Sequence, residues 1–240
     1  MSTKDESNLV YRASGKAGSN LSRRFLQCFS IPRSQLFIEQ DAKDTTHGNG
    51  TWRRGDRNIL FSSRALHFSL SARQQATLPD LFAENAAVIL YLDHVNLLSF
   101  YGLCLEATPP LFLFECTPLG TLASYINQSD SSVIVALSMG SQVCAGMAFL
   151  SHNNILHLSL SVRTCYVSEG LVVKISDLGL IRILEKLAGP MSALDLRISA
   201  PEGPMEGNFS LASDVWSFGV LLWELVSDCR DIPYANLQVL

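Results

Sequence analysis

Short runs of alternating apolar and polar residues dominate the first part of the chain, between residues 25 and 73. The turn-forming segments HGNG and RRGDRN interrupt these runs, and this pattern predicts short β-strands joined by turns. Residues 72–92 carry apolar side chains at helical spacing and predict a helix. Two further apolar runs, 97–105 and 111–116, predict a pair of strands.

The second part of the chain has a mainly helical pattern. Apolar residues recur at helical spacing over residues 133–150, and a second, buried helix is predicted over 212–227. A short strand is predicted at 171–175. We therefore expect an α+β chain, with a small strand-rich part that contains one helix and then a mainly helical part. Residues 1–24, rich in Ser, Gly and Asn, are expected to form a flexible leader.

The composition limits which partners and which cellular location are expected for the chain. The 240 residues carry a net charge of −4, with a pI near 5.7, so the basic surface that nucleic acid binding needs is absent and no such partner is expected. The longest apolar stretch, 215–226, is interrupted by polar residues and is too short to span a membrane. The N-terminus lacks the apolar core of a signal peptide. We expect a cytoplasmic location, or the cytoplasmic part of a receptor if the chain is a fragment.

A series of short motifs follows in order from Asp93 onward. They are HVNLLSFYGLC, LFLFECTPLGTL, SQVCAGMAFLSHNNILHLSLSVRTCYV, VVKISDLGLIR, LRISAPE, SDVWSFGVLLWELVS and IPYANLQVL. In this order and at these intervals, they resemble the motifs of protein tyrosine kinases. The resemblance implies a two-lobed protein-kinase-like fold, with an N-lobe at residues 25–115 and a C-lobe at 116–240 that lacks its last helices.

The resemblance also implies a glycine-rich loop and a helix glutamate around the phosphates of a nucleotide. The loop corresponds to Gly48 and Gly50, in a segment that an ordinary Asn-Gly turn explains equally well. The glutamate position corresponds to Asn85. Glu84 lies one residue earlier, which turns a helical side chain by about 100°.

The phosphate-binding lysine of the family has no counterpart in the expected strand. The segment ALHFSLS matches that strand by its alternation and places Ser69 near the lysine position, while Arg64 falls off register. The sequence has no lysine at all between Lys43 and Lys174.

The adenine side of the implied nucleotide pocket has large side chains. Phe114 takes the gatekeeper position, and Glu115 and Thr117 lie in the hinge between the lobes. Tyr166 stands where the family usually has a leucine below the adenine ring. Phe114 and Tyr166 are expected to narrow the pocket.

The catalytic loop departs from the family pattern H-R-D-L-A-A-R-N. His157 is kept, but Ser159 replaces the proton-accepting aspartate and Thr164 replaces the metal-binding asparagine. A hydroxyl near neutral pH is not a general base. Asp177 of the D-L-G segment remains, either as a single metal ligand or as an ordinary turn residue.

These substitutions lead to the expectation that the chain is not an enzyme. The resemblance then implies a pseudokinase that scaffolds or allosterically regulates a protein partner, such as an active kinase, without a cofactor. The alternative is a weak or unconventional kinase that binds ATP and Mg²⁺ at low affinity through Asp177. A third alternative is a decayed product without a stable fold.

Overall fold

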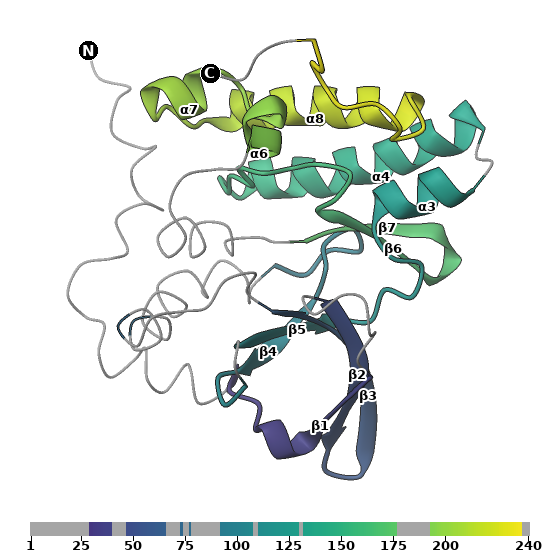
Figure 1. Cartoon of the computed structure of the whole chain (residues 1–240), viewed down its shortest axis with the longest axis vertical. Coiled ribbons are helices and arrows are strands. Elements are labelled where there is room, and N and C mark those ends of the chain that lie inside the picture. Colours follow the sequence, from purple (N-terminus) through teal and green to yellow (C-terminus); the bar gives the residue numbers. More distant parts are fainter. Residues whose placement is uncertain are drawn as a thin grey trace.

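A five-stranded antiparallel sheet forms the first lobe (Figure 1). The computed structural model describes residues 29–39, 47–65, 92–107, 110–129, 132–176 and 193–236, with the single positions Arg73 and Thr77. The strands lie in the order β1-β2-β3-β5-β4. Their bounds are β1 Leu36–Glu39, β2 His47–Arg54, β3 Arg57–Ala65, β4 Phe100–Cys104 and β5 Leu111–Glu115, and the short 3₁₀ helix η1, Arg33–Gln35, precedes β1.

Alternation along these strands separates a buried face from a more exposed face. On the buried side, Leu36, Phe61, Cys104 and Leu113 form a small core together with Ile31, which comes before the first strand. Phe61 and Leu113 are completely buried. This core places β3 in the middle of the sheet, beside β5, so that residues near the end of β3 face the second lobe.

The second lobe is mainly helical and has a larger core. Its long helices are α4 and α8, and at Gly140 they approach so closely that a Cβ atom would lie 2.7 Å from the side chain of Leu222. A two-stranded sheet of β6 and β7 packs near α4. The elements in chain order are α3 Leu122–Gln128, α4 Val133–His152, β6 Cys165–Ser168, η2 Glu169–Leu171, β7 Val172–Ile175, α6 Ala193–Ile198, α7 Glu202–Glu206 and α8 Leu211–Val226.

Backbone hydrogen bonds join the two lobes beside the hinge. The amide of Ile175 donates to the carbonyl of Asn96 at 2.8 Å, and the amide of Leu98 donates to the carbonyl of Ile175 at 2.8 Å. The side chain of Asn96 adds a bond to the carbonyl of Val173 at 2.9 Å. The end of β7 is therefore held against the segment that leads into β4, and a cleft lies next to this junction.

The structure confirms the predicted two-lobed, protein-kinase-like fold. The predicted strand pair is present as β4 and β5, the predicted strand at 171–175 is present as β7, and both predicted long helices are present as α4 and α8. The strand beside β5 covers Arg57–Ala65, whereas the segment 65–71, predicted as the lysine-bearing strand, lies outside the described residues except for Ala65. The predicted leader lies outside the described residues, and of the helix predicted over 72–92 the structure describes only Arg73, Thr77 and Leu92. The lobe boundaries remain a prediction.

Helix α4 is long and apolar enough to cross a membrane by length and composition alone. The core helix of a soluble protein passes the same test, and α4 buries Met139, Val143 and Leu150 in the core of the second lobe. The sequence analysis had considered a different segment, 215–226, as the longest apolar stretch, and that segment lies in α8. The expectation that the chain has no membrane span stays a prediction.

Candidate functional site

A cavity of about 740 Å³ lies between the two lobes, beside the hinge. Strands β1, β2, β3 and β5 line it on one side, and α3 together with β6 lines it on the other. Four of the predicted nucleotide-pocket positions are among the residues that line it: Gly48, Phe114, Thr117 and Tyr166. Side chains of Asn49, Ser62, Thr121, Ser124 and Gln128 add hydrogen-bonding groups to the walls.

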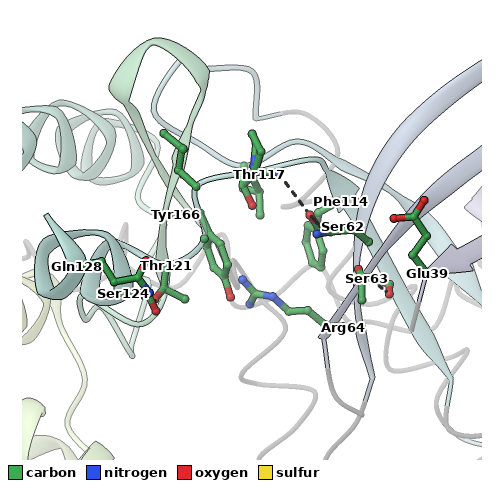
Figure 2. A pocket seen from close by; sticks show the side chains of 16 residues that line it. Glu39, Ser62, Ser63, Arg64, Phe114, Thr117, Thr121, Ser124, Gln128 and Tyr166 are labelled. Atoms are coloured by element: carbon green, nitrogen blue, oxygen red, sulfur yellow. Dashed lines mark hydrogen bonds between the residues drawn. The ribbon is translucent and has the colours of Figure 1, made fainter. Parts of the chain in front are cut away.

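Arg64 is the basic residue of this cavity. Among the described residues that line the cavity, it is the only cation, and Glu39 is the only anion. Figure 2 shows its side chain extending from β3 toward Tyr166. The guanidinium carbon lies 4.4 Å from the ring centre of Tyr166 and 5.3 Å from that of Phe114. Its Nη2 donates to Ser176 Oγ at 2.9 Å, so one side chain of the first lobe contacts two groups of the second.

Arg64 lies near the cavity on β3, while the predicted lysine position stays a prediction. Because β3 ends at Ala65 and pairs with β5, Arg64 lies at the end of the central strand, opposite Phe112. The predicted lysine position, Ser69, lies outside the described residues, as does Asn85. A signal for strand β3 was present in the sequence: the middle of RRGDRN, Gly55-Asp56, forms the tight turn between β2 and β3, and β3 begins at Arg57.

Two other predicted pocket positions lie elsewhere in the structure. Gly50 packs against β1, where a Cβ atom would come within 2.4 Å of the carbonyl oxygen of Phe37. The carboxylate of Glu115 pairs with Lys174 Nζ at 2.8 Å and accepts a hydrogen bond from the amide of Ser99 at 2.8 Å. Neither residue is among those that line the cavity. Gly50 therefore lets β2 pack closely against β1, and Glu115 joins β5 of the first lobe to β7 of the second.

The predicted catalytic loop is held by buried hydrogen bonds around His157. The Nδ1 atom of this histidine accepts from the amide of Ser159 at 3.3 Å, so the ring proton lies on Nε2, which donates to the carbonyl of Ser176 at 2.8 Å. Thr164 Oγ1 accepts from the amide of Ser161 at 2.9 Å and donates toward the carbonyl of Ser159. His157 and Thr164 thus shape the loop backbone.

Ser159 has no hydrogen-bond partner for its hydroxyl among the described residues, although the residue is only 4% exposed. A buried hydroxyl without a partner is uncommon in folded proteins. The described residues contain no cluster of three metal-ligating side chains. Asp177, the predicted metal ligand, lies outside the described part of the chain.

Asp214, near the start of α8, forms hydrogen bonds to the backbone of the same loop. Its two carboxylate oxygens accept from the amides of His157, at 2.8 Å, and Leu158, at 2.9 Å. Leu158 has a φ angle of +74°, a left-handed conformation that is costly for a leucine. Because Asp214 is only 4% exposed, its carboxylate is the buried anchor of this strained turn.

The fold and the site together define a protein-kinase-type domain. The family model of protein tyrosine and serine/threonine kinases matches residues 67–239, and the chain belongs to this family. It is 31% identical over 96% of its length to "Tyrosine-protein kinase abl-1" of Caenorhabditis elegans, and 35% identical over 66% of its length to human "Tyrosine-protein kinase ABL2". Human "Tyrosine-protein kinase TXK" is 34% identical over 66% of the chain.

These comparisons correct the expectation that the chain is not an enzyme. The relatives that it matches over 66–96% of its length are named as tyrosine-protein kinases. The substitutions in the catalytic loop had suggested the opposite, but they concern single positions in a chain whose motifs follow the order of the family from Asp93 onward. The chain spans 14–31% of the length of these relatives.

Proposed function

We propose that this chain is a tyrosine-kinase-like signalling domain that binds an adenine nucleotide with low affinity in the cavity between its lobes. Arg64 carries this proposal. A guanidinium is permanently charged and presents several N–H donors in a fixed plane, so it suits the oxygens of a phosphate chain. The hydroxyl and amide groups around Arg64 fit the oxygens of an anionic ligand, although the cavity of about 740 Å³ is also lined by one anion, Glu39.

The same proposal includes slow phosphoryl transfer. A nucleotide supplies the phosphoryl group, and Mg²⁺ held by Asp177 would neutralise its charge. At the position of the proton acceptor, Ser159 offers a hydroxyl, which is a poor base near neutral pH and typically lowers such a rate by roughly 10²–10⁴-fold. We therefore expect activity that is low but measurable.

A role as a scaffold or allosteric regulator of a protein partner, such as an active kinase in the cytoplasm, is the second candidate. The observation that favours it is the outer face of α8. Val215, Trp216 and Trp223 are 69%, 41% and 42% exposed there and line an apolar groove with Tyr234. Exposed apolar patches of this kind often mark protein contacts. No nucleic acid partner is proposed, because the chain is acidic overall.

Replacing Arg64 by alanine is expected to weaken binding of Mg-ATP by about ten- to a hundredfold, because hydrogen bonds to charged groups contribute about 1.5–3 kcal/mol. Isothermal titration calorimetry measures this change directly. Arg64→Lys, which keeps the charge but loses the planar set of donors, is expected to bind with an affinity between those of the wild type and Arg64→Ala. Arg57→Ala is the matched control, since Arg57 lies on the same strand but is exposed. Equal affinities in Arg64→Ala and wild type, or no binding of Mg-ATP by the wild type, would contradict the proposal.

A further inference from the structure

The hydroxyl of Ser62 accepts a hydrogen bond from a backbone amide on the wall of the cavity, that of Thr117. Ser62 precedes Arg64 by two residues on β3, so both side chains leave the same face of the strand. Ser62 Oγ donates to Asn49 Oδ1 at 2.8 Å and accepts from the amide of Thr117 at 3.4 Å. Figure 2 shows the second bond as a dashed line across the cleft between β3 and the hinge.

The amide of Thr117 has a fixed position. Thr117 is only 5% exposed and lies two residues after the end of β5, and its carbonyl accepts from the amide of Gly120 at 3.1 Å. A buried amide needs an acceptor, because leaving it unpaired carries a large cost. In the absence of a ligand, Ser62 provides that acceptor from within the chain.

The bond between these two groups is long. Amide-to-oxygen hydrogen bonds usually measure about 2.9–3.0 Å, and at 3.4 Å the attraction is much weaker. The Ser62 hydroxyl cannot move closer freely, because its proton is committed to Asn49 on the neighbouring strand. A ring nitrogen of a bound base would make a better acceptor for Thr117, but it must first displace the hydroxyl.

We propose that Ser62 is a specificity-determining residue of the cavity, which competes with the base of a nucleotide for the Thr117 amide. This inference rests on the proposed function, because it assumes that the phosphate chain lies toward Arg64. The inference assigns different residues to the two parts of a nucleotide, the phosphate chain and the base. Arg64 attracts any polyphosphate, whereas Ser62 opposes only a ligand that carries a hydrogen-bonding ring.

A merely structural role for Ser62 predicts a different outcome. If the hydroxyl served only to hold β3 against the hinge, its removal would loosen the cavity and weaken every ligand alike. The comparison of a ligand with a base and one without a base therefore separates the two roles. Mg-ATP and magnesium tripolyphosphate are such a pair, since both present three linked phosphates and only one carries a ring.

The experiment is calorimetric titration of both ligands into the wild type, Ser62→Ala and Arg64→Ala. We expect Ser62→Ala to bind Mg-ATP about two- to tenfold more tightly, as one weak hydrogen bond no longer has to be broken, and to bind tripolyphosphate with unchanged affinity. Arg64→Ala is expected to weaken both ligands. Asn58→Ala is the control, because Asn58 lies on the same strand, is exposed and is not among the residues that line the cavity.

The possible results distinguish this inference from the proposed function. If Mg-ATP binds to the wild type and weakens in Arg64→Ala, but Ser62→Ala leaves its affinity unchanged, only the role of Ser62 is overturned. Equal changes for both ligands in Ser62→Ala also overturn it. If Mg-ATP binds to Ser62→Ala and not to the wild type, the role of Ser62 is supported and the proposed function fails. No binding by any of the proteins overturns both.

Discussion

Replacing Asp214 by alanine is expected to lower the free energy of unfolding by about 3–5 kcal/mol, because two hydrogen bonds to a charged group are lost at once. The amides of His157 and Leu158 would then lack an acceptor inside the protein. The turn at Leu158, with its φ of +74°, would also lose the contact that holds it in a costly conformation. In a chain of this size, such a loss lowers Tm by about 10 °C.

Urea denaturation followed by far-UV circular dichroism measures this change. Asp214→Asn, which keeps one carbonyl oxygen but no charge, is expected to lose about half as much. Asp231→Ala serves as the control, since Asp231 is exposed after the end of α8 and should change stability by less than about 0.5 kcal/mol. A stability of Asp214→Ala equal to that of this control would show that the loop does not depend on the carboxylate.

Much of the second lobe could be predicted from the sequence, because the relevant information is local. The pattern of α4 and α8 repeats over many residues, and the motif around His157 fits a loop whose bonds are short-range, such as Ser159 to His157. The pairing of β4 with β5 follows from two apolar runs close together in the chain. In these cases spacing alone limits what the segments can form.

The centre of the cavity could not be predicted in this way. Residues 57–65 and the segment 65–71 both alternate, and only a pairing such as that of Phe61 with Glu115 places residues 57–65 in the central strand. That pairing joins positions far apart in the sequence. The bond between Ser62 and Thr117 spans 55 residues, and no spacing rule indicates it. As a result, Arg64 appeared off register in the sequence although it lies in the cavity.

The substitutions around the cavity act on different steps of a kinase cycle. Arg64 keeps a cation for the phosphate chain, and the buried bonds of His157 keep the loop in shape. In the proposals above, Ser62 opposes the base and Ser159 provides a poor proton acceptor. We therefore expect binding of a polyphosphate to be retained best, recognition of the base to be reduced, and transfer to be reduced most. For this reason, ligand affinity and turnover should be measured separately in each variant.

Replacing Arg163 by alanine is expected to be the second most damaging change, at about 2–3 kcal/mol near pH 7. Its Nη1 pairs with Glu224 Oε1 at 2.9 Å, and Glu224 is completely buried in α8. Removing one partner of a buried ion pair costs roughly 3–5 kcal/mol. The value expected here is lower because the side chain of Arg163 is 40% exposed and water can partly replace it. Unfolding in urea at pH 7 checks the result, with the exposed Arg230→Ala as control.

The dependence on pH distinguishes this ion pair from simple loss of packing. Burial raises the pKa of Glu224 above its ordinary value of 4.5, and Arg163 opposes that rise. In the folded state the carboxyl therefore holds its proton to higher pH than in the unfolded state, so stability falls as the pH rises from about the unfolded value through the folded value. Without Arg163 the folded pKa rises further and this loss grows, so Arg163→Ala should be most damaging at pH 7 and much less so at pH 4. Adding Glu224→Gln to Arg163→Ala removes the charge and should restore most of the stability at pH 7. A cost of Arg163→Ala that is the same at both pH values, and unchanged in the double variant, would mean that the arginine stabilises the fold through its methylene groups and not through its charge.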